Sequence, residues 1–188
     1  YRASEWLGVL KSYLSKLGES PKDWEIYRGD EFQLRVPLEQ AFEVAIRIKA
    51  IMKSIKGLDV RMGIGIGGET FVGLGVSESN GPAYQRSGRT FESLKEEKLN
   101  LTIATGNDAY DRTLNLMLKL ALGFMDDWST VSAEIVALAL ENPETSQQEI
   151  AKRLGIQQSA VSQRQKRARL DLVLELLRYY AETVKENA

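Results

Sequence analysis

The sequence predicts an α+β fold for residues 1–106 and an all-helical fold for residues 107–188. In the first part, segments whose apolar residues have helical spacing alternate with short segments rich in β-branched and aromatic residues. Beyond Ala104 the chain is a succession of segments with helical spacing. The boundary falls within Thr105 to Asp108, where a glycine is followed by two residues that favour the start of a helix.

Each element of the first part has its own signal. Apolar residues share one helical face of the opening segment, which ends at a glycine and a proline. Phe32, Leu34 and Val36 alternate with polar residues, as in a half-buried hairpin strand. We therefore expect helices on one face of a mostly antiparallel sheet. The expected elements are helices at 3–17, 38–55 and 82–97 and strands at 24–28, 32–36, 58–67 and 99–104.

Composition excludes several classes of protein. The chain has 188 residues, of which 43% are hydrophobic and 27% charged, so it can bury a core of its own. It contains no cysteine and no histidine, which rules out disulfides, thiolate zinc sites and histidine-based triads. Lys119 and Gly123 interrupt its most apolar segment, so no run approaches the roughly 18 apolar residues of a membrane helix. We expect a cytoplasmic protein without a membrane partner.

Residues 145–169 have the spacing of a helix-turn-helix. Gly155 permits the turn between the two helices, because glycine adopts positive φ readily. Gln165 stands where many such motifs carry leucine, so we expect the end of the second helix to be less firmly seated. The packed face of the two helices is expected to consist of Ile150, Ala151, Leu154, Ile156 and Val161.

The exposed side of the second helix suits DNA. Its amide, hydroxyl and amine groups can hydrogen-bond base edges and phosphates in a major groove. Residues 145–169 include six basic side chains and Glu149 as the one acid, although the whole chain has a net charge of −1. An ordinary solvated helix pair is the alternative interpretation of these charges. The residues predicted to contact DNA are Gln157, Gln158, Ser159, Ser162, Gln163, Arg164, Lys166 and Arg167.

Three further helices are expected in the second part. One is capped by Asn107 or Asp108 and runs towards Trp128, a second spans about 131–140, and a long terminal helix follows Arg169 without a wing. An apolar stripe on the terminal helix is typical either of a short coiled coil or of packing on the protein's own core. That stripe consists of Leu170, Leu174, Leu177, Ala181 and Val184.

Three segments of the first part resemble the class III nucleotidyl cyclase domain in order and spacing. They are RGDEFQ at 28–33, VRMGIGIGGETFVGLG at 60–75 and AYQRSGRTFESL at 83–94. With the C-terminal helix-turn-helix added, the chain is similar to the SatD family of small bacterial proteins. The resemblance implies a ferredoxin-like palm whose first strand would precede Tyr1. It also implies a metal site of two aspartates, of which one matches Asp30 and the other would lie on that missing strand.

The match with cyclases is incomplete at the positions that would handle the nucleotide. Ile26 stands where cyclases generally have a base-recognising lysine, and Glu92 and Glu96 stand where they have an asparagine and an arginine. Acidic groups there would repel phosphate. Asp30 is therefore either a candidate Mg²⁺ ligand or part of a tight hairpin turn.

Gly63, Gly65 and Gly67 fall on one face of the predicted strand because they recur every second residue. We expect them to permit the close approach of a helix or a flat ligand. A phosphate-binding loop is less favoured, since no helix follows immediately.

The sequence thus predicts a DNA-binding transcriptional regulator with a degenerate cyclase-like part that serves as sensor, dimerisation platform or scaffold. DNA and a second copy of the chain are the expected partners, with a nucleotide and Mg²⁺ as further candidates. The alternative is a nucleotide-binding or cyclase-like enzyme, in which the helix-turn-helix serves only to determine where the enzyme is located. A third interpretation has the helix-turn-helix contact protein. No residue is assigned a catalytic role.

Overall fold

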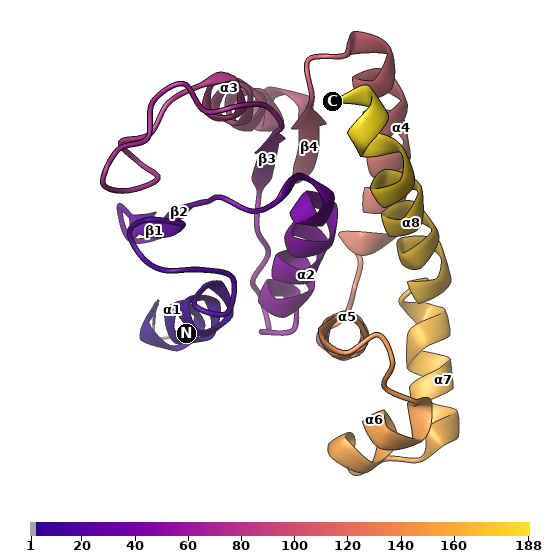
Figure 1. Cartoon of the computed structure of the whole chain (residues 1–188). Helices are drawn as coiled ribbons and strands as arrows, with labels where there is room; N and C mark the ends of the chain where they lie inside the picture. The colour runs from indigo at the N-terminus through magenta and orange to yellow at the C-terminus, as the bar shows by residue number, and fades with distance from the viewer. Residues whose placement is uncertain (1–2) are drawn as a thin grey trace.

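The computed structural model describes residues 3–188 and follows the predicted order of elements (Figure 1). The first part comprises α1 (Ala3–Leu14), β1 (Trp24–Tyr27), β2 (Glu31–Leu34), η1 (Leu38–Gln40), α2 (Ala41–Lys53), β3 (Met62–Gly65), α3 (Pro82–Glu97) and β4 (Leu101–Ala104). The second part comprises α4 (Asp108–Met125), α5 (Thr130–Glu141), α6 (Gln147–Leu154), α7 (Gln158–Arg167) and α8 (Leu170–Asn187). The fold is mixed α+β, mostly helical, with small sheets and a helical C-terminal region.

The strands form two separate two-stranded sheets, which corrects the prediction of one mostly antiparallel sheet. β1 and β2 form the predicted antiparallel hairpin, with Trp24 opposite Leu34. β3 and β4 are parallel, with Met62 opposite Leu101. The parallel direction follows from the connection, because α3 crosses over between the two strands. The predicted strand at 58–67 shortens to the four residues that pair with β4.

α2 is the central helix of the hydrophobic core. Its buried residues cover most of its circumference, and it packs against α1, η1, α5 and α8. Lys49 lies within this core with a fully buried side chain, where its ammonium donates to Asp59 over 2.9 Å. The same nitrogen lies 2.6 Å from the Asp126 carboxylate, so the buried charge is compensated by two acids.

The terminal helix α8 packs lengthwise on the rest of the molecule (Figure 1). The ring of Tyr180 stacks on Phe42 of α2 with a centroid distance of 4.1 Å, and its hydroxyl donates to the Leu38 carbonyl. The buried stripe differs from the predicted one, since Leu174 and Ala181 are exposed. The buried stripe consists of Leu170, Val173, Leu176, Tyr180 and Val184. Between Ala3 and Ala188, no helix has both the length and the apolar character that crossing a bilayer requires.

Candidate nucleic-acid interface

α5, α6 and α7 form a three-helix unit at the end of the molecule away from the small sheets (Figure 1). α6 begins with a capping box in which the Ser146 hydroxyl accepts from the Glu149 backbone N–H, while the Glu149 carboxylate accepts from the Ser146 N–H over 2.8 Å. These hydrogen bonds from Ser146 lower the pKa of Glu149. The single acid of the segment is therefore engaged in starting α6.

The turn between α6 and α7 has the predicted geometry. Gly155 has φ of +64°, in the left-handed region that favours glycine. The next N–H, of Ile156, donates to the Ala151 carbonyl over 3.0 Å and closes the end of α6. Ala151 is buried, as are Ile150 and Val161 at the contact between the helices. Two short helices joined by the predicted turn at Gly155 are thus present in the structure.

Polar contacts hold the end of α7, where Gln165 stands in place of the usual leucine. Gln165 accepts a hydrogen bond from the Gln147 amide of α6 over 2.6 Å, so a polar contact replaces the expected leucine contact. Ala168, directly after α7, is fully buried and its carbonyl accepts from the Trp128 indole over 2.9 Å. Gln147 also accepts from Gln158 at the start of α7. Sequence reasoning missed Gln147, because only the crossing of the two helices shows that it faces α7.

Most of the residues predicted to contact DNA lie on the solvent side of α7. The exposed ones are Gln157, Gln158, Ser159, Ser162, Gln163, Lys166 and Arg167. Arg164 differs, because it is half-buried and points towards Glu134 of α5 at 3.8 Å. The structure therefore gives Arg164 a contact within the protein. The α7 surface, as we call the exposed residues of α7 and its cap Gln157, contains no acidic side chain.

The basic residues around the α7 surface differ in how they are paired. Arg153 of α6 forms an ion pair with Glu141 at 3.2 Å. Lys152, Lys166, Arg167 and Arg169 are exposed and make no ion pair among the residues that the structure describes. These four cations remain available to an anionic partner.

The second candidate site, at Asp30, is a turn in the structure. Asp30 is exposed in the loop that joins β1 to β2, where Arg28 and Gly29 both have positive φ. Within residues 3–188 no group of three or more acidic side chains is placed so that it could hold a metal ion. One exposed carboxylate does not supply the set of oxygen ligands that Mg²⁺ requires, so the described residues do not fit this cofactor.

The glycine face of β3 is covered by α3. A methyl group on Gly63 would lie 2.6 Å from the Phe91 backbone nitrogen, and one on Gly65 would overlap the backbone at Ala83 and Ser87. The glycines therefore allow a helix to approach closely, which was one of the two predicted roles. Because α3 fills this space, the face is closed to a flat ligand.

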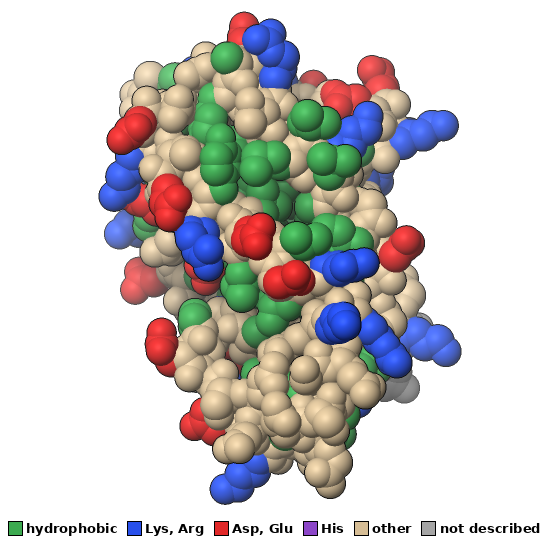
Figure 2. All heavy atoms as spheres, turned by 90° about the vertical axis from the view of Figure 1, so that its right-hand side faces the viewer, with side chains coloured by type: hydrophobic (Ala, Val, Ile, Leu, Met, Phe, Trp, Pro, Cys, Tyr) green, Lys and Arg blue, Asp and Glu red, His purple; other side chains and the backbone are tan. Residues whose placement is uncertain are grey.

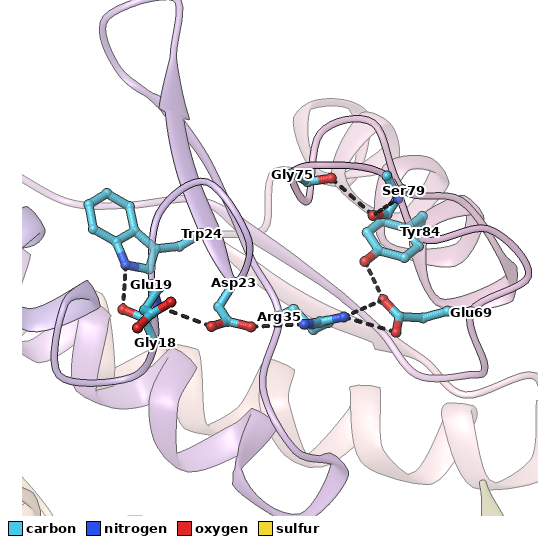
Figure 3. Close-up of polar contacts among 10 residues, drawn as sticks. Gly18, Glu19, Asp23, Trp24, Arg35, Glu69, Gly75, Ser79 and Tyr84 are labelled. Carbon is cyan, nitrogen blue, oxygen red and sulfur yellow. Dashed lines mark hydrogen bonds and ion pairs between the residues drawn. The ribbon is translucent and has the colours of Figure 1, made fainter.

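A chain of polar contacts connects the hairpin to the loop that precedes α3 (Figure 3). The guanidinium of Arg35 donates to Asp23 over 2.8 Å and to both oxygens of Glu69 over 3.0 and 3.1 Å. The Tyr84 hydroxyl donates to the same Glu69 carboxylate. The Arg35 hydrogen bond lowers the pKa of Asp23, and the Tyr84 hydrogen bond, followed by Arg35, lowers the pKa of Glu69. Each charged side chain in this series of contacts is paired, so the contacts hold the loop before α3 in place.

The described residues define a small, mostly helical α+β protein with a helical C-terminal region that contains the α6–α7 pair. The sequence profile of the SatD family matches residues 9–183, and the chain therefore belongs to the SatD family. No curated protein and no solved structure is similar enough to match the chain.

Proposed function

We propose that this protein is a transcriptional regulator that binds DNA by placing α7 in the major groove. The observation that carries the proposal is the α7 surface, which presents amides, hydroxyls and two cations with no acid among them. Such groups match base edges and phosphates. The position of α6 and α7 at one end of the molecule supports the same function, because no other element projects beyond them there (Figure 1).

The first part of the chain then serves as a body that supports the helix-turn-helix. We propose that it is a degenerate relative of the cyclase domain, with a ferredoxin-like ancestry, on the basis of the order and spacing of its motifs. The departures at Ile26, Glu92 and Glu96, and the isolation of Asp30, favour a sensor or scaffold over catalysis. In this proposal the protein is cytoplasmic, and its target is DNA.

Fluorescence anisotropy with labelled genomic fragments tests DNA binding. The variant Lys166→Ala with Arg167→Ala removes two unpaired cations from the α7 surface. We expect weaker binding to every sequence and a salt dependence, in log K against log salt, that is shallower by about two units. Gln163→Ala should instead change the sequence preference, by roughly 1–3 kcal/mol at one base position.

The matched control is Lys56→Ala with Lys95→Ala. Both lysines are exposed, lie far from α7 in sequence and form no ion pair among residues 3–188. This control changes net charge equally and should leave affinity and salt dependence nearly unchanged. Equal binding by the Lys166 and Arg167 variant and the wild type would reject the proposal.

A further inference from the structure

One side of the helical part exposes apolar side chains on two neighbouring helices. Leu116 and Leu120 of α4 are 60% and 70% exposed, and Leu172 of α8 is 42% exposed. Tyr179, on the same side of α8, is half-buried. Figure 2 faces this side and shows hydrophobic side chains gathered over its middle, with acidic and basic side chains among and around them. A contiguous apolar surface rimmed by charges is typical of a binding site for another protein.

Two hydrogen bonds fix how α4 and α8 lie against each other. The Tyr110 hydroxyl, at the start of α4, lies 2.6 Å from the Thr183 hydroxyl near the end of α8. The Trp128 indole, just beyond the end of α4, donates to the Ala168 carbonyl just before α8. The two helices are therefore antiparallel, and each residue of α4 has a definite level along α8.

Two cations on the outer margin of α4 and two acids on the outer margin of α8 have opposite signs, although Glu97, Asp108 and Asp111 line the same side of α4. Arg112 and Lys119 lie on the margin of α4, at helical spacing from Leu116, and Glu175 and Glu182 lie on the margin of α8. All four are exposed and take part in no ion pair within the described chain. Because both helices rise ~1.5 Å per residue, counting from the contact at the start of α4 brings Arg112 within one residue of the level of Glu182 and Lys119 within one residue of the level of Glu175.

We propose that this side of α4 and α8, the α4–α8 face, binds a second copy of the chain about a two-fold axis parallel to the helices. Such an axis keeps every residue at its level and exchanges the two helices, so α4 of each copy lies against α8 of the other. Arg112 and Lys119 then lie opposite Glu182 and Glu175 of the second copy. The exposed leucines are buried between them, and the four helices form an antiparallel bundle.

The face has the dimensions of a dimer interface. Each helix has 18 residues, so the pair is about 27 Å long and about 20 Å wide in projection. The accessible surface of its uneven side chains is larger than this flat area. A standard interface buries about 800 Å² of accessible surface on each partner. At the outer end, Asp108 comes within one residue of the level of Glu186, so like charges meet there. Complementary charges occupy the two central levels, and they favour a second copy over an unrelated partner.

Charge exchange tests the proposal by light scattering at micromolar concentration. The acidic variant carries Arg112→Glu and Lys119→Glu, and the basic variant carries Glu175→Lys and Glu182→Lys. We expect about twice the 21.1 kDa chain mass for the wild type, and the mass of one chain for either variant alone, because each then opposes like charges. Mixing the two variants should restore the two-chain mass, since every opposed pair again has opposite signs.

A matched control is Lys56→Glu with Lys95→Glu, which changes net charge as much as the acidic variant does but at exposed positions off the face. It should keep the two-chain mass. Leu120→Asp should give single chains by a second route, and circular dichroism confirms that each variant is folded. A one-chain mass for the wild type at high micromolar concentration, or a two-chain mass for both charge variants alone, would overturn the proposal. None of these measurements involves DNA, so they stand apart from the test of the proposed function.

Discussion

Arg35 joins two carboxylates that come from distant parts of the sequence, Asp23 before the hairpin and Glu69 in the loop before α3 (Figure 3). The side chains of the three residues are between 23% and 30% exposed, so solvent screens the contacts only in part. Pairing of this kind favours the ionised carboxylates, and the pKa of each acid is lower in the folded protein than its usual value.

This lowering gives the folded protein a stability that depends on pH. The carboxylates stabilise the fold above their ordinary pKa values of 3.8 and 4.5, and the contribution is lost as the pH falls through the lower folded values. We expect Arg35→Met to lower the free energy of unfolding by about 1 kcal/mol at pH 7, and by less at pH 3. Urea unfolding at both pH values measures the difference, with Arg61→Met as control, because Arg61 is exposed and forms no ion pair among residues 3–188. An equal loss at both pH values would contradict the assignment.

Single residues of the α7 surface could be predicted to different extents. Ser159 and Lys166 are exposed because helical spacing alone places them on the side of α7 opposite the buried Val161. The pairing of Arg164 with Glu134 depends instead on the packing of α5 against α7. That packing is a tertiary contact, and no local pattern in either helix specifies it.

At the scale of elements, the contact between β3 and α3 depends on the absence of a side chain. We expect Gly65→Ala to lower the free energy of unfolding by about 3 kcal/mol, because the methyl group would overlap the backbone of α3, which cannot move independently. Gly88→Ala is the matched control: this glycine lies within α3, with open space where a Cβ would be. It should raise stability by ~0.5–1 kcal/mol through helix propensity. Chemical denaturation compares the two, and a neutral Gly65→Ala would disprove the close-packing role.

Local sequence patterns predicted where the helices and strands lie better than they predicted which of these elements pair or pack together. α3 has the bounds predicted for it, from Pro82 to Glu97, and Gly155 ends α6 at the predicted turn. The pairing of β3 with β4 could not be predicted, because it joins strands separated by a whole helix. The face of α8 was ambiguous for another reason. Leucine or valine occupies nearly every position from 170 to 177, so two different stripes have similar apolar character.

At the scale of the molecule, α5 belongs to two packing units at once. It supports α7 within the helix-turn-helix, and it also packs along α2. Glu141 at its end forms ion pairs with Lys16 after α1, with Arg47 of α2 and with Arg153 of α6. The Lys16 hydrogen bond is the main cause of the lowered pKa of Glu141. Most of the buried hydrophobic residues accordingly form one continuous cluster from α1 to α8.

A continuous core should unfold as one unit. We expect scanning calorimetry of the chain to show a single transition, with equal calorimetric and van't Hoff enthalpies. A fragment of residues 107–188 should lack a cooperative transition, because it exposes the side of α5 that α2 covers. Two resolved transitions in the whole chain, or a stably folded fragment, would show that the helix-turn-helix is independent.

The direction of α8 determines whether the proposed dimer suits an inverted or a direct repeat in DNA. α7 leads directly into the start of α8, so a two-fold axis parallel to α8 leaves both copies of α7 at the same end of the dimer. They are then related by that axis, which matches an inverted repeat with half-sites about 34 Å apart. On a direct repeat, only one α7 at a time could reach its half-site in the correct orientation. If the protein binds DNA as the proposed dimer, α8 would thus restrict the operator to a palindrome although α8 itself contacts no base.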